Sequence, residues 1–95
     1  MKLFSNEKKL LATQRTLEQK REEFRITNEQ IVALEEELDR SRIDAMVSET
    51  PLAERIWHEH QRHMDAYLKD KHVLELQIDE LERRCNDLRN LNFQS

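Results

Sequence analysis

The chain has 95 residues, of which 38% are charged, and it carries a formal net charge of −4 at pH 7 and no glycine. This length allows at most one small domain, and the negative charge argues against a general binder of nucleic-acid phosphates. Because sheet folds and phosphate-binding loops need the turns that glycine supplies, a composition rich in Glu, Lys, Arg and Leu without glycine predicts an all-α fold of long helices.

The first predicted helix covers about residues 6–47. Ser5 is a start signal ahead of Asn6, and the proline at position 51 disfavours helical backbone just before it, so the helix should stop by about residue 48. Apolar residues recur along it every seven positions, at Leu3, Leu10, Leu17, Phe24, Ile31, Leu38 and Ala45. A mixed companion column lies three residues further on and holds Thr13, Lys20, Thr27, Leu34 and Ser41.

The second predicted helix covers about residues 51–91, after a turn at residues 48–50 and before a short tail at residues 92–95. Thr50 suits the N-cap, and Pro51 suits the first helical position because its φ already fits and no N–H is needed there. Steps of three and four residues define a second seam, through Trp57, His60, Met64, Tyr67, Lys71, Leu74, Ile78, Leu81, Cys85 and Leu88.

Two heptad seams of similar length on either side of a short turn predict an antiparallel coiled-coil hairpin that forms a single domain over residues 1–95. Folding the chain at the turn sets Leu17 opposite Leu81 and Leu38 opposite His60. The alternative is an extended parallel coiled-coil dimer kinked at Pro51, which the leucine column of the second helix also suits.

The distribution of charge supports the hairpin. Residues 1–28 carry seven Lys and Arg against four Glu, whereas residues 29–50 carry two Arg against seven acids. In the hairpin the basic start lies along the acidic end of the second helix, which places Arg21 near Glu75. Exposed pairs of this kind contribute only ~0.2–1 kcal/mol, so they indicate orientation rather than stability.

The stretch HEHQRH, residues 58–63, contains three of the four histidines. It resembles the HExxH motif of zinc proteases only superficially, because Arg62 stands where the second histidine is required. His60 and His63 share one helix face and are weak candidates for metal ligands. No cysteine or second histidine pair completes a usual zinc set, so we expect no metal site here.

A half-buried seam position for His60, with His63 beside the acidic LEEELD run, is the favoured interpretation. In the hairpin Glu35 or Glu37 would approach these rings. Protonation in mild acid would then place cations beside carboxylates and strengthen this end of the hairpin. A His60 buried in its neutral form predicts the opposite response.

Nothing in the sequence supports catalysis. The serines, threonines and Cys85 are not spaced for nucleophilic work, and a two-helix rod lacks a concave pocket that would orient a substrate. We therefore expect no enzyme, no catalytic residue, no cofactor and no small-molecule substrate. The lone cysteine excludes an intrachain disulfide and suits a reducing compartment, the cytoplasm with the nucleus as alternative. No apolar run approaches the ~20 residues that span a membrane.

Apolar residues outside the two seams are the main indication of function. They are Leu11, Ile26, Val32, Met46, Val47, Ile56, Leu68, Val73, Leu76, Leu91 and Phe93. A thin rod that exposes so many apolar side chains needs a further helix to cover them, from a second copy or from another protein. We expect this contact to use Leu11, Ile26, Val32, Met46, Ile56, Leu68, Leu76 and Leu91.

These features predict a non-enzymatic protein–protein interaction module, a small structural or adaptor subunit or assembly factor of a larger complex. A different class is an inhibitor or export-chaperone-like protein, which fills a partner's groove with one amphipathic helix and is disordered when free. A third and less favoured class is a histidine-dependent metal-binding module, which would retain zinc through dialysis.

Overall fold

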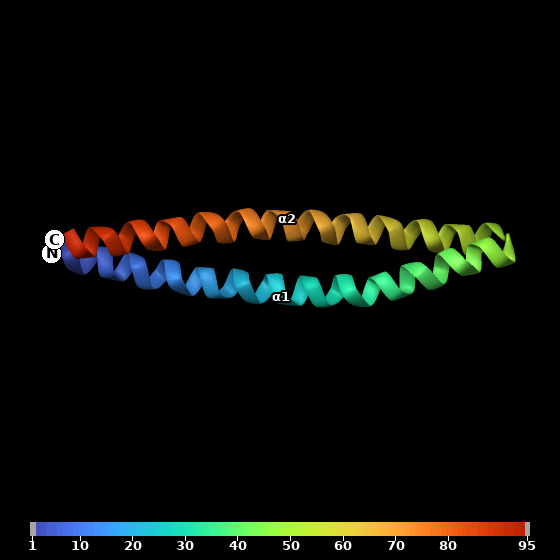
Figure 1. The fold of residues 1–95 in the computed structure, drawn as a ribbon, viewed down its shortest axis with the longest axis horizontal. Helices are drawn as coiled ribbons and strands as arrows, with labels where there is room; N and C mark the ends of the chain where they lie inside the picture. Colours follow the sequence, from blue (N-terminus) through green and yellow to red (C-terminus); the bar gives the residue numbers. More distant parts are fainter. Residues whose placement is uncertain (1, 95) are drawn as a thin grey trace. The chain divides into compact units, whose positions relative to one another are not determined.

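Two long helices form almost all of the structure, a computed structural model that describes residues 2–94 and the side chains of residues 5–91. Helix α1 spans Lys2–Ser48 and helix α2 spans Pro51–Gln94 (Figure 1). No strand occurs among the described residues. The predicted all-α hairpin of two long helices is confirmed.

Both helices extend further towards the chain ends than predicted. Helix α1 begins at Lys2 rather than near residue 6, and α2 continues to Gln94 through most of the segment predicted as a tail. Neither end contains a proline or glycine that would stop a helix, and Ser5 is tolerated inside one. The expected N-terminal boundary and the expected tail are therefore wrong.

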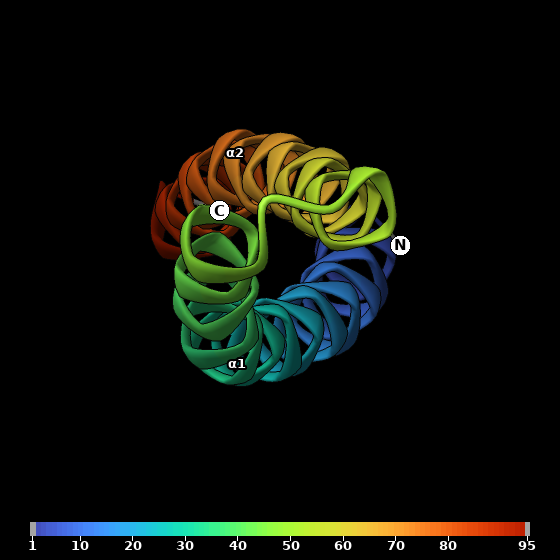
Figure 2. The ribbon, with the colours of Figure 1, turned by 90° about the vertical axis from the view of Figure 1, so that its right-hand side faces the viewer.

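Glu49 ends helix α1 in the left-handed backbone region, with φ of 52°. Its N–H donates to the carbonyl oxygen of Ala45 at 3.2 Å, which satisfies one of the free carbonyls at the helix end. Glycine is the residue that usually occupies this position, but the chain contains none. The connection between α1 and α2, which contains Glu49, faces the viewer in Figure 2.

Thr50 begins helix α2 as predicted. Its hydroxyl Oγ1 accepts a hydrogen bond from the Ala53 N–H at 3.2 Å, and its carbonyl oxygen accepts the first helical hydrogen bond, from the Glu54 N–H, at 3.1 Å. Pro51 occupies the first helical position. The predicted N-cap and the predicted start of the second helix are confirmed.

Contacts divide the chain into two compact units, each with segments of both helices. Unit 1 joins Met1–Phe24 with Val73–Ser95, and unit 2 is Arg25–His72, which includes the turn. In the extended dimer kinked at Pro51 the two helices of one chain would stay apart, so that alternative is not the arrangement observed. That residues 1–95 act as a single domain stays a prediction.

Unit 2 has an apolar core of Ile31, Leu34 and Met64, against which Leu38 and Tyr67 pack. Nearer the turn, Ser41 of α1 contacts His60 of α2, with 3.0 Å between Oγ and Nδ1. Positions further along α1 therefore contact positions earlier in α2. This is the pattern expected of helices that run in opposite directions.

Unit 1 contains an ion pair between Arg21 and Glu82, with 3.0 Å between Nη2 and Oε1. Arg21 and Glu75 line one recess, as the expected proximity requires, but the ion pair of Arg21 is with Glu82, two helical turns further along α2. Side chains on a helix lean towards its N-terminus, so Arg21 reaches back to the level of Leu17, whose predicted seam partner is Leu81. Glu82 is the next residue along α2 from that level.

The buried side chains follow the predicted heptad seams. All ten that the described residues contain belong to them: Thr13, Leu17, Thr27, Ile31, Leu34, Ser41, Ala45, Met64, Leu74 and Cys85. Every other seam residue with a described side chain is half-buried, and the side chain of Leu3 lies outside the described ones. The seam positions are confirmed.

Candidate functional site

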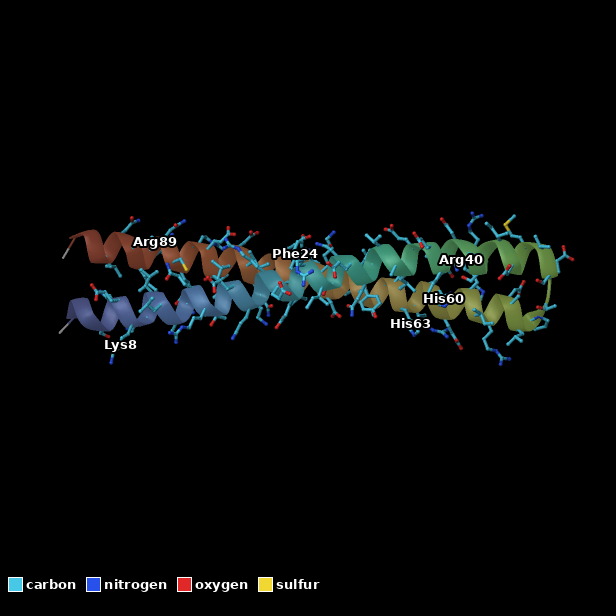
Figure 3. All side chains as sticks on the ribbon, turned by 90° about the horizontal axis from the view of Figure 1, so that it is seen from below. Lys8, Phe24, Arg40, His60, His63 and Arg89 are labelled. Atoms are coloured by element: carbon cyan, nitrogen blue, oxygen red, sulfur yellow. The ribbon has the colours of Figure 1, made fainter. Side chains whose placement is uncertain are left out.

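The histidine stretch does not form one site, because its members lie in separate surroundings. The ring of His58 stacks on that of Trp57, with centroids 5.3 Å apart, and its Nδ1 lies 3.1 Å from Oε1 of Gln61. His60 contacts helix α1, whereas His63 is exposed (Figure 3). The three rings therefore do not converge on a common ligand.

His60 lies in a small polar network across the seam of unit 2. Its ring Nδ1 is 3.0 Å from Ser41 Oγ, and its Nε2 is 3.8 Å from Oε2 of Glu37. The Ser41 hydroxyl donates to the carbonyl oxygen of Leu38 at 2.9 Å. The His60 side chain is 24% exposed, as expected of a half-buried seam residue.

The direction of these hydrogen bonds determines what the network can do. A serine, a histidine and a glutamate also make up catalytic triads, in which the imidazole removes the serine proton. Here the Ser41 hydroxyl is also within hydrogen-bond distance of a backbone carbonyl oxygen, that of Leu38, which competes with His60 for the serine proton. Ser41 is also only 5% exposed, out of reach of a substrate. The network joins the two helices and gives no support to hydrolysis.

No metal-binding group was found around the two candidate ligands. Of the two acids expected near His60 and His63, Glu37 approaches His60, whereas Glu35 pairs with neither ring. Across the described residues, no three His, Cys, Asp or Glu side chains are placed to hold a metal ion. The response of these histidines to pH stays a prediction.

The outward apolar residues are exposed where the sequence predicted them. The eight residues expected to form the contact are 40% to 64% exposed: Leu11, Ile26, Val32, Met46, Ile56, Leu68, Leu76 and Leu91. Val47 and Val73 are exposed as well, and the side chain of Phe93 lies outside the described ones. Whether these residues bind a partner stays a prediction.

Ile43 and Leu52 are exposed apolar residues that the sequence interpretation missed, at 51% and 63% exposure. Ile43 lies two residues before the seam residue Ala45, and Leu52 directly follows Pro51. The seam register, extended through the turn, places both positions outside the seam. That register is the signal that could have found them.

Exposed apolar side chains are concentrated around the turn. We define the turn surface by five of them, which fall within residues 43–56: Ile43, Met46, Val47, Leu52 and Ile56. A recess of about 200 Å³ lies beside it, between Asp44 and Ser48 of α1 and Leu52, Ala53 and Ile56 of α2. Leu52 and Ile56 are the two residues of the turn surface that line this recess.

The turn surface lies in the most acidic part of the chain. Residues 35–59 contain eight Asp and Glu against three Arg. Two of these arginines are already paired, Arg40 with Glu36 at 3.8 Å and Arg42 with Asp39 at 3.9 Å. Among the described residues, the carboxylates of three acids close to the turn form no ion pair: Asp44, Glu49 and Glu54.

Cys85 is buried in unit 1, with 1% of its surface exposed, and forms no disulfide. It lines a recess together with Leu17, Arg21 and Glu82. A disulfide between two copies of the chain would first require the helices of unit 1 to separate.

Over the described residues, neither helix has a stretch apolar enough for a membrane crossing. Comparison with protein-family models finds no family that matches, and searches of curated proteins and of solved structures give no significant match. The residues and their geometry therefore carry the functional argument.

Proposed function

We propose that the chain is a non-enzymatic protein–protein interaction module, a small structural or adaptor subunit or an assembly factor of a larger complex. One observation carries this proposal. Among the described residues, twelve large apolar side chains are exposed by 40% or more, whereas seven apolar side chains are buried. A monomeric soluble protein rarely exposes so much apolar surface without a binding partner.

The seam within the hairpin supports the same conclusion. Three of its ten buried residues are polar, namely Thr13, Thr27 and Ser41, and such positions contribute less to stability than aliphatic ones. Two helices joined by this seam gain from a third that covers their outer faces. Partner binding would proceed by helix-on-helix packing, with charged residues setting the orientation.

The test begins with light scattering and circular dichroism on the purified chain. We expect a helical chain that self-associates, and a variant with Val32→Ser, Leu68→Ser and Leu76→Ser that remains helical but is monomeric. A matched control replaces exposed polar residues, Gln30→Ser and Gln77→Ser, and should associate as the parent chain does.

Two results would contradict the self-associating form of the proposal. An unfolded monomer would support the inhibitor or export-chaperone alternative, in which the helix forms only on binding. A helical monomer whose solubility and melting do not change in the triple serine variant would show that the outward residues have no partner to meet.

A further inference from the structure

The turn surface has a charge that identifies the chemistry of its partner. Building on the proposed function, we propose that the recess lined by Leu52 and Ile56 of the turn surface docks a cationic amphipathic helix of another protein. Leu52 and Ile56 are exposed apolar residues, and the carboxylate of Asp44 belongs to the same recess.

The recess between Asp44 and Ile56 suits a side chain of a partner rather than a free ligand. Its volume of about 200 Å³ lies below the roughly 300–1,000 Å³ of small-molecule sites. Leu52 and Ile56 lie one helical turn apart and line it, so both contact whatever enters. An aliphatic side chain on a helix is an occupant of suitable size and polarity.

The unpaired carboxylates select a basic partner. Asp44 lines the recess, Glu49 lies in the connection between the helices, and Glu54 lies in the first turn of α2. A second copy would bring the same negative charge to a turn-to-turn contact, and an anionic membrane or a nucleic acid would also be repelled. Lysine or arginine beside the anchoring apolar residue would be attracted.

A helix is the partner element that fits this geometry. The recess is walled by α1 on one side and α2 on the other, so a third helix can lie against both. Such a helix presents apolar anchors at positions i, i+3, i+4 and i+7, with basic residues at the edges of its apolar face. Salt should weaken the complex, chiefly by slowing association.

The test titrates the full chain into a short fluorescent probe helix built from leucine and lysine, with all leucines on one face. A second probe has the same composition in an order that distributes the leucines around the helix. We expect the first probe to bind at one site per chain. The Leu52→Ser, Ile56→Ser double variant should weaken it by about tenfold or more, as for anchor residues of an interface.

Matched variants separate the turn surface from general attraction between opposite charges. Asp44→Asn should weaken the first probe by about twofold to threefold, whereas Asp65→Asn, which removes the same charge elsewhere in unit 2, should not.

Three outcomes would overturn the inference. They are no binding of the first probe, equal binding of both probes, and equal weakening by the turn variants and their controls. Self-association that the Leu52→Ser, Ile56→Ser variant abolishes would assign the surface to a second copy instead. None of these outcomes decides whether the proposed function is correct, because its test measures helicity and assembly without a probe.

Discussion

His60 Nδ1 and Ser41 Oγ form a hydrogen bond of 3.0 Å across the two helices of unit 2. The direction follows from the serine, whose own proton is donated to the Leu38 carbonyl oxygen at 2.9 Å. With the serine proton directed to that carbonyl, we predict that neutral His60 carries its proton on Nδ1; its Nε2 lies 3.8 Å from Oε2 of Glu37. Nitrogen-15 NMR of the imidazole should show the Nδ1–H tautomer, and a ring protonated only on Nε2 would contradict this network.

Removing the acceptor of this hydrogen bond should destabilise the hairpin. Ser41→Ala leaves the His60 N–H half-buried without a partner, which costs ~1–2 kcal/mol in the free energy of unfolding. Urea denaturation followed by circular dichroism measures the change. In a chain that also carries His60→Leu, the same substitution should cost much less, because no unpaired N–H remains.

Thr16→Ala is the control for this substitution. Thr16 also donates to a backbone carbonyl oxygen of its own helix, that of Ala12, at 3.1 Å, but it is exposed and accepts nothing from α2. Its replacement should leave stability unchanged or slightly improved, because alanine has the higher helix propensity. Equal losses for the two variants would show that the contact across the helices contributes nothing.

The start of helix α2 depends on the side chain of Thr50. Thr50→Ala removes the acceptor for the Ala53 N–H and should lower the free energy of unfolding by about 0.5–2 kcal/mol. Thr50→Ser keeps the hydroxyl and should stay close to the parent chain in thermal and urea denaturation. Loss of stability in the serine variant as large as in the alanine variant would argue against capping.

Glycine at position 49 should stabilise the chain. Glu49 has φ of 52°, where its Cβ crowds the backbone, and this crowding costs roughly 1–2 kcal/mol. Part of the gain is offset by the greater freedom of glycine when unfolded, so we expect Glu49→Gly to add about 0.5–1 kcal/mol. Glu49→Ala removes the same charge but keeps a Cβ, and urea denaturation should show no comparable gain.

The seam and the turn are predictable from the sequence because local chemistry determines both. Burial in a two-helix hairpin repeats with the heptad, so the spacing of one apolar column is enough to locate Leu17, Ile31 and their neighbours in the seam. Thr50 and Pro51 mark the new helix through a cap and a fixed φ, which need no tertiary information.

Features that depend on side-chain direction or on weak local preferences are not predictable in the same way. The partner of Arg21 depends on how its long side chain leans along the helix, which spacing alone does not reveal. Helix ends without a proline or glycine have no strong signal, so Ser5 gave a false start. The seam register could have identified Ile43 and Leu52 as exposed, but the recess that Leu52 shares with Asp44 of α1 exists only in the hairpin.

Cys85 offers a measurement of how often unit 1 opens. Its thiol is 1% exposed, so a thiol reagent should label it only when the helices of unit 1 separate. We expect labelling at least about a hundredfold slower than in the urea-unfolded chain, which corresponds to an opening free energy of ~3 kcal/mol. A control chain with Cys85→Ala and Asn86→Cys moves the thiol to the adjacent exposed position and should react at nearly the unfolded rate. Equal rates for the two folded chains would mean that unit 1 is open in solution and that its seam does not form.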